Sequence, residues 1–173
     1  LTKEKAMGTV EQLLMTPANT TEIIIAKIAP LFLLLMLTVC LILGVCVFVF
    51  QVPIRGSLGL IFLASALCVL CGIGLGTFIA TFTKNATQAQ LLSIFFNPPI
   101  AMLSGAMTPI EAMPEWIQPV TYLNPVRYFT IIVRSLMMKD TPPSALYIHF
   151  LALLIFATIL VSLSVGRFRK QLS

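Results

Sequence analysis

Long uncharged apolar runs constrain this chain more than any other feature. The first covers residues 28–50 and the second 57–82, and neither contains Asp, Glu, Lys or Arg. A helix needs about 20 apolar residues to cross the hydrocarbon core of a bilayer, so both runs are long enough. Because they lack the alternating pattern of a transmembrane barrel, we predict an all-α membrane protein.

Two further runs bring the predicted number of transmembrane helices to four. They cover about 89–107 and 145–165, and His149 is the only histidine in the chain. Charged residues make up only 10% of the 173 residues, against about 25% in soluble domains. A soluble core of this length could not hide that much apolar surface, so we expect the bilayer as a partner. The positive charges are too scattered for a nucleic-acid interface.

The basic residues predict the orientation, because cytoplasmic loops are enriched in Lys and Arg. With the N-terminal side inside, the inner segments carry Lys3, Lys5, Lys27, Lys84, Arg167, Arg169 and Lys170. The outer segments carry Arg55, Arg127, Arg134 and Lys139. We therefore expect both ends of this segment in the cytoplasm. The first residue is leucine, which leads us to expect a part of a longer chain.

Residues 1–27 are half-polar, and we predict a cytoplasmic elbow in front of a transmembrane domain, 28–173. Apolar side chains recur at helical spacing as far as Leu14. Pro17 ends this short helix, since proline restricts the residue before it. Asn19 then resembles the cap of a second helix that continues into the first span. An amphipathic helix resting on the membrane surface is the alternative interpretation.

Small residues form a row along the second span. They recur every four positions and share one helix face: Ala64, Cys68, Gly72, Gly76 and Ala80. Such rows let helices approach closely in lipid. We therefore predict a helix-packing stripe, whose partner lies either in this chain or in another one.

The third span is predicted to be a broken helix at Asn97, Pro98 and Pro99. Each proline removes a backbone donor and clashes with the preceding turn. Broken helices at membrane depth are tolerated where neighbours or a cavity satisfy the freed carbonyls. The break would therefore either line a transport pathway or serve packing alone.

The segment between the third and fourth spans is predicted to contain a re-entrant or interfacial helical hairpin, residues 113–138. Its first helix would cover 113–117, with Pro114 at the first helical position and Trp116 suited to the membrane interface. After Asn124 and Pro125, the apolar helix 126–138 is too short to span.

Arg127 and Arg134 lie seven residues apart, on one face of that last helix. They would contact lipid phosphates, pair with Glu111 or Glu115, or line an exit. The alternative is ordinary snorkelling to the interface.

Several chemistries are missing from the sequence. It contains no GxxxxGK[ST] loop for ATP, and no paired carboxylates lie in the spans for proton coupling. One histidine and four scattered cysteines do not make a metal site. We therefore expect no catalytic residue, cofactor or metal in this chain. An ATP-independent channel or secondary carrier, and a truncated remnant without transport, stay open as alternatives.

Four segments resemble one family in order and spacing. They are GTVEQLLMTPANTTEIIIAK, VPIRGSL, LSGAMTPIEAMPEWIQPVTYLNPVRYF and RSLMMKD, the last followed by a span and a basic tail. Together they resemble the type-2 ABC transporter permeases, the efflux branch of ATP-binding-cassette systems, and the resemblance covers essentially the whole chain. That family has six spans, of which the first two and a large outer domain have no counterpart here.

The resemblance implies a permease of an ATP-driven exporter in the bacterial inner membrane. A cytoplasmic ATPase, as a separate subunit or a fused domain, would bind ATP and Mg²⁺. Its docking site would be a coupling helix made of Gly8, Thr9, Val10, Glu11, Gln12, Leu13, Leu14, Thr16 and Pro17. A second permease, identical or different, would complete the pathway. An outer gate would then include Pro114, Trp116, Asn124, Pro125, Arg127 and Arg134.

Overall fold

The computed structural model describes residues 20–52, 56–83, 85–138 and 143–172. These residues form five α-helices and two short 3-10 helices, with no strand in the described ranges. The α-helices are α3 (Thr20–Phe48), α4 (Leu58–Thr81), α5 (Ala86–Leu103), α6 (Pro125–Met138) and α7 (Pro143–Leu172). The 3-10 helices are η1 (Ile110–Ala112) and η2 (Gln118–Leu123). The all-α prediction is therefore confirmed for this part of the chain.

Three helices in the described part are long and apolar enough to cross a membrane. Their spanning segments are Ile28–Phe48, Leu58–Thr81 and Ser144–Gly166. The predicted third span corresponds to α5, which has 18 residues and includes Pro98 and Pro99. At 1.5 Å per residue α5 is about 27 Å long, slightly shorter than a hydrocarbon core of about 30 Å. Three spans are thus seen by length and composition, and the four-span layout stays a prediction.

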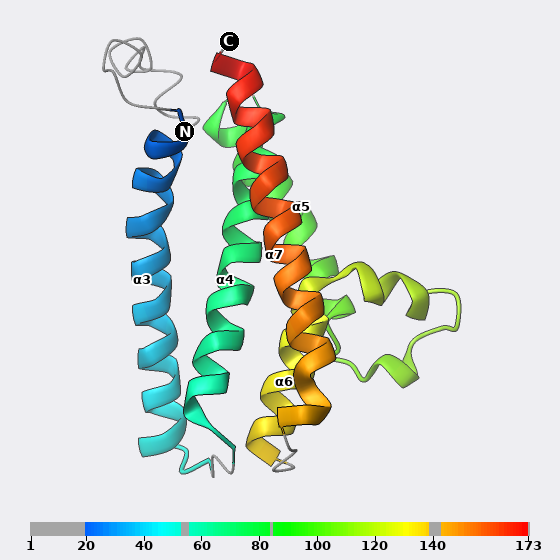
Figure 1. Ribbon diagram of the computed structural model, residues 1–173. Helices are drawn as coiled ribbons and strands as arrows, with labels where there is room; N and C mark the ends of the chain where they lie inside the picture. The colour runs from blue at the N-terminus through cyan, green and yellow to red at the C-terminus, as the bar shows by residue number, and fades with distance from the viewer. Residues whose placement is uncertain (1–19, 53–55, 84, 139–142, 173) are drawn as a thin grey trace.

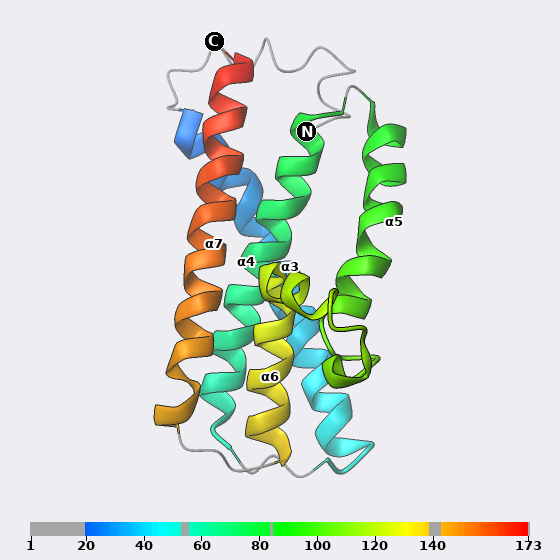
Figure 2. The same cartoon turned by 90° about the vertical axis from the view of Figure 1, so that its right-hand side faces the viewer.

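The helices form an elongated bundle whose ends are clearly defined (Figure 1). The start of α3, the end of α4, the start of α5 and the end of α7 lie at one end. The end of α3 and the start of α4 lie at the opposite end, together with the end of α6 and the start of α7. Figure 2 shows α5 standing apart from α7, on the other side of α4.

The core lies where α4, α6 and α7 meet. Its buried cluster contains Ile61 and Ala64 of α4, Ile132 and Leu136 of α6, and Leu146 of α7. The buried residues of α7 recur at spacings of seven and four, so one face of this helix is directed inward: Leu146, Leu153, Ala157 and Ser164. The Ser164 hydroxyl donates a hydrogen bond to Oγ1 of Thr77, which ties α7 to α4.

Many large apolar side chains outside this core are exposed. On α3, Leu34, Leu37 and Leu41 are 61%, 61% and 64% exposed, and no residue in its spanning segment is buried. In water such a surface would be strongly unfavourable. In a bilayer the lipid tails cover it, which is the arrangement expected of a membrane-spanning bundle.

Candidate functional site

The segment between α5 and α6 is the candidate functional site. We call Ser104–Asn124 the outer loop; it contains η1 and η2. In Figure 1 it projects sideways from the bundle, at a height between the two ends of α4 and α7. α5 ends before it reaches the far end of the bundle, and α6 begins part-way along it and runs to that end. Non-helical backbone therefore lies beside spanning helices.

Most of the backbone hydrogen bonds of the outer loop are closed locally. In η1, Ala112 and Met113 donate to Pro109 and Ile110 at 3.1 and 3.0 Å. In η2, the Val120 amide donates to the Ile117 carbonyl at 2.9 Å. Since an unpaired peptide group costs several kcal/mol in hydrocarbon, this pairing is compatible with the predicted re-entrant placement of the loop, which stays a prediction.

The predicted helix at 113–117 is not formed. The structure has a turn there, closed by the Ile117 amide on the Pro114 carbonyl at 2.9 Å, and the 3-10 helix begins at Gln118. The physical reason is Pro119, which follows immediately. It has no N–H to donate to the Glu115 carbonyl, so an α-helix starting at Pro114 cannot continue.

The outer loop ends at Asn124, whose side chain contacts two helices. Its Nδ2 donates to the Ile100 carbonyl in the last turn of α5 at 2.6 Å. Its Oδ1 accepts a hydrogen bond from the Val126 amide at 3.0 Å, so Asn124 caps α6 with Pro125 at the first helical position. The prediction of a helix over 126–138 is confirmed, with its start one residue earlier.

A second contact ties the beginning of the outer loop to α6. Arg134 donates through one guanidinium nitrogen to the Gly105 carbonyl at 3.3 Å. Gly105 has φ +77°, a left-handed conformation that favours glycine, and this residue ends α5. The predicted span ran on to 107, and the turn at Gly105 is the reason that the helix is shorter.

Arg127 lies against the end of η2. Its guanidinium carbon is 3.8 Å from the centre of the Tyr122 ring, and one of its nitrogens donates to the Thr121 hydroxyl. Its Nε is buried and has no hydrogen-bond partner among the described residues. No ion pair joins Arg127 or Arg134 to a carboxylate there, so the predicted pairing with Glu111 or Glu115 is not observed. Cation–π contact with Tyr122 partly replaces it.

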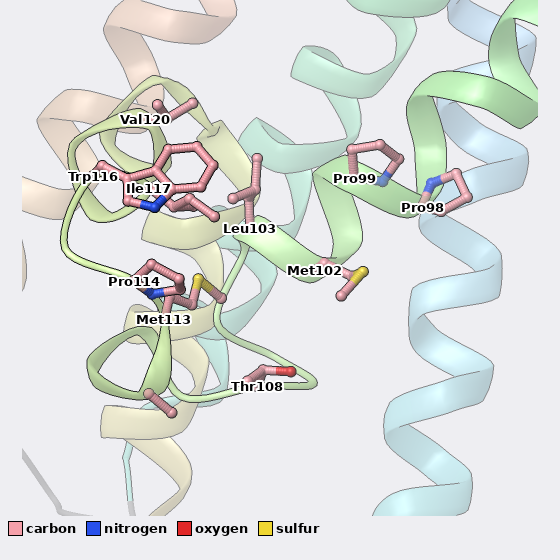
Figure 3. Close-up of a pocket in the computed structure, with 11 residues that line it drawn as sticks. Pro98, Pro99, Met102, Leu103, Thr108, Met113, Pro114, Trp116, Ile117 and Val120 are labelled. Atoms are coloured by element: carbon pink, nitrogen blue, oxygen red, sulfur yellow. The ribbon is translucent and has the colours of Figure 1, made fainter.

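An apolar cavity of about 650 Å³ lies between α5 and the outer loop. In Figure 3, Trp116, Ile117 and Val120 of the loop face Leu103 of α5 across it. The remaining lining residues are Pro98, Pro99, Met102, Thr108, Ala112, Met113 and Pro114. The only polar groups among these lining side chains are the Thr108 hydroxyl and the indole N–H of Trp116. The cavity therefore fits an apolar molecule or an apolar side chain.

The predicted break at Asn97, Pro98 and Pro99 lies inside α5, which continues as a helix to Leu103. The prolines cannot donate to the carbonyls four residues earlier, so two helical hydrogen bonds are missing without ending the helix. Pro98 and Pro99 also line the cavity, while Asn97 is exposed. Whether these residues line a pathway stays a prediction.

The predicted packing stripe on α4 is only partly in contact within this chain. Ala64 is fully buried, but Gly72 and Gly76 are exposed and have no atom within 4 Å of the position of an added Cβ. Cys68 and Ala80 are half-buried. The stripe therefore does not form the main seam with α7.

The closest approaches involve two glycines that the sequence reasoning missed. A Cβ on Gly74 would lie 2.9 Å from Cβ of Leu160, so α7 packs directly on the α4 backbone there. A Cβ on Gly56 would lie 2.8 Å from the Leu136 carbonyl, to which the Gly56 amide donates at 2.9 Å. Three glycines alternate at 72, 74 and 76. This alternation places small residues on more than one face of α4, so it does not show which face packs closely against a neighbour.

The predicted coupling helix, Gly8–Pro17, lies outside the described residues. The second helix of the predicted elbow is described from Thr20, where α3 begins, and it continues through Pro30 into the first span. The second helix of the predicted elbow and the first span are therefore parts of one continuous helix.

Comparison with known proteins gives a consistent result. Residues 1–165 match the family model described as ABC-2 family transporter protein. The chain is 36% identical over 173 residues to the probable multidrug ABC transporter permease YbhS of Escherichia coli K12, and 30% identical over 169 residues to YbhR, a probable multidrug permease of that strain. It is 32% identical over 173 residues to the inner membrane transport permease YhhJ of that strain.

These matches cover 98%, 98% and 99% of this chain, but 45%, 46% and 46% of the respective relatives. The chain thus spans about half the length of the curated relatives it matches. No solved structure matches it.

Proposed function

The chain belongs to the ABC-2 family of transporter proteins, and from this premise we propose that it forms part of the membrane-spanning permease of an ATP-driven exporter. The observation that carries the proposal is the family match over residues 1–165, which coincides with three helices able to span a membrane. Permeases of this kind supply the path for the substrate, while ATP hydrolysis takes place on another domain or subunit.

The proposed energy source is a cytoplasmic ATPase, either a separate subunit or a fused domain, which binds ATP and Mg²⁺. Residues 8–17 would dock into it as the coupling helix. Val10, Leu13 and Leu14 would pack against the ATPase or the elbow, and Glu11 and Gln12 would make polar contacts. In support, α3 runs uninterrupted from Thr20 into the membrane, so a push at its cytoplasmic end would be transmitted along a rigid helix.

The proposed pathway lies between this permease and a second one, identical or different. The outer loop would be part of its outer gate, since it lies beside the spanning helices and carries an apolar cavity. Two relatives are named probable multidrug permeases. We extend this to the present chain as a preference for apolar substrates, because the cavity presents almost only apolar groups.

We propose the bacterial inner membrane as the location, with the start of α3 and the end of α7 on the cytoplasmic side. In support, one relative is named an inner membrane transport permease. The two helix ends also lie together at one end of the bundle (Figure 1), as the distribution of Lys and Arg requires.

Glu11→Arg and Leu14→Asp test the coupling helix in the full permease, expressed together with its ATPase. We expect each change to reduce copurification of the ATPase by at least about tenfold, since an unpaired charge buried in an interface costs several kcal/mol. Thr2→Arg serves as the control for added charge. Undiminished copurification in both variants would refute the docking role.

Transport is tested separately by reconstitution in vesicles, where ATP-dependent efflux of an apolar dye is expected only when both components are present. Equal flux without ATP and without the ATPase would instead identify a channel or a secondary carrier.

A further inference from the structure

The Asn124 side chain serves two helices at once. It is only 7% exposed, and its two polar atoms have different partners. Oδ1 accepts from the Val126 amide at the start of α6, while Nδ2 donates to the Ile100 carbonyl at the end of α5. The second bond joins residues that are 24 positions apart and closes the base of the outer loop.

Only an amide of this length meets both requirements. Serine, threonine and aspartate also cap helix N-termini well. None of them supplies an N–H directed at the Ile100 carbonyl, since an ionised carboxylate only accepts hydrogen bonds and a hydroxyl is shorter. The cap alone therefore does not explain asparagine at this position, whereas the bond to α5 does.

Apolar packing contributes little to holding the end of α5. None of the residues of α5 is buried within the described part of the chain. The side-chain hydrogen bonds described between the end of α5 and the α6 region come from Asn124 and from Arg134, which reaches the Gly105 carbonyl. The bond from Asn124 ties the end of the outer loop to α5, and the bond from Arg134 of α6 ties its beginning to α6.

We propose that Asn124 is a positioning residue that makes the end of α5 and the start of α6 move as one unit, so that the outer loop and its cavity keep their shape during the transport cycle. The inference rests on the proposed export function. Its physical basis is that the buried side-chain amide of Asn124 would be left without its acceptor, so the two helix ends separate only at a free-energy cost.

The test uses spin labels at Phe95 and Glu115, two exposed positions on α5 and on the outer loop that do not line the cavity, in the full permease with its ATPase. Asn124→Ser and Asn124→Thr keep a capping oxygen for α6 and lose the donor to Ile100, because their hydroxyls are shorter than the amide. Asn85→Ala is the matched control, because Asn85 is the N-cap of α5 but its side chain makes no capping hydrogen bond. Thermal unfolding of each variant establishes that the bundle is intact.

In the wild type and in Asn85→Ala we expect one narrow distance distribution, unchanged by ATP. In Asn124→Ser and Asn124→Thr we expect a second, broader population that rises by about tenfold, and a loss of ATP-driven efflux with the ATPase still bound. Narrow, unchanged distances in both Asn124 variants would overturn the inference, as would broadened distances with full efflux. Absence of ATP-driven efflux in the wild type would instead refute the proposed function, and the distances would still decide the role of Asn124.

Discussion

At the residue level, the contact between α4 and α7 depends on the absence of a side chain at Gly74. A Cβ there would lie 2.9 Å from Cβ of Leu160 and 3.2 Å from the Val161 amide nitrogen. Two turns of backbone can approach this closely in lipid only where a small residue lies between them. The neighbouring hydrogen bond between Ser164 and Thr77 adds a polar contact to the same seam.

Gly74→Ala should therefore destabilise the protein by about 1–3 kcal/mol, because the added methyl group overpacks a rigid backbone contact. Gly72→Ala is the matched control on the same helix, where an added Cβ meets nothing within 4 Å. It should be neutral, or stabilising by up to about 1 kcal/mol through helix propensity. The measurement is the midpoint of thermal unfolding in detergent. Equal shifts for the two variants would contradict the described seam.

At the element level, α3 and α7 differ in how they are surrounded. The spanning segment of α3 has no buried residue, while α7 directs one face into the core. Both spanning segments are apolar enough to cross a membrane, so this property alone does not show which helix is central. The difference comes from position in the bundle: α7 packs on α4 and α6, and α3 lies at the edge (Figure 1).

The same substitution in both helices measures this difference. Leu153→Ala, at a position with no exposed surface, should cost about 2–5 kcal/mol through the cavity it leaves. Leu37→Ala, 61% exposed, should cost less than about 0.5 kcal/mol, as at a surface position away from special contacts. Denaturant or thermal unfolding of the purified permease gives both values. A large loss for Leu37→Ala would mean that another protein segment covers this face of α3.

The sequence predicted most of the helices, but it did not predict which face of each helix packs against its neighbours. Three of the four predicted spans are found by length and hydropathy, while α5 as a span stays a prediction. The helix α6 was predictable from its apolar run after Asn124 and Pro125. The predicted helix over 113–117 is a turn instead, because Pro119 lacks the amide that would continue the helix. The seam at Gly74 was missed because small residues lie on several faces of α4, and only packing against α7 selects one of them.

For the whole molecule, we expect residues at the two ends of the bundle to be accessible from opposite sides of the membrane. The starts of α4 and α5 lie at opposite ends of the bundle (Figures 1 and 2). Ser57 and Asn85 are the N-caps of these two helices, and both are exposed. If the start of α3 is cytoplasmic, Ser57 is outside and Asn85 is inside.

Single cysteines at these positions test the orientation, in a background where the four native cysteines are replaced by serine or alanine. Ser57→Cys should react with a membrane-impermeant maleimide in spheroplasts, and Asn85→Cys only after the membrane is permeabilised. Labelling is read by a gel shift. The reverse pattern would invert the proposed orientation, and labelling of both from outside would show that α4 does not cross the membrane.

The closed hydrogen bonding of the outer loop has a consequence for the energetics of movement. A segment at bilayer depth normally resists displacement, because shifting it uncovers peptide dipoles that hydrocarbon cannot solvate. In the outer loop the 3-10 turns keep many of their own bonds, and Gln118 adds a side-chain bond to the Met113 carbonyl at 3.0 Å. A displacement of this loop together with α5 and α6 would therefore keep these bonds, and those of Asn124 and Arg134, and mainly exchange one set of dispersion contacts for another.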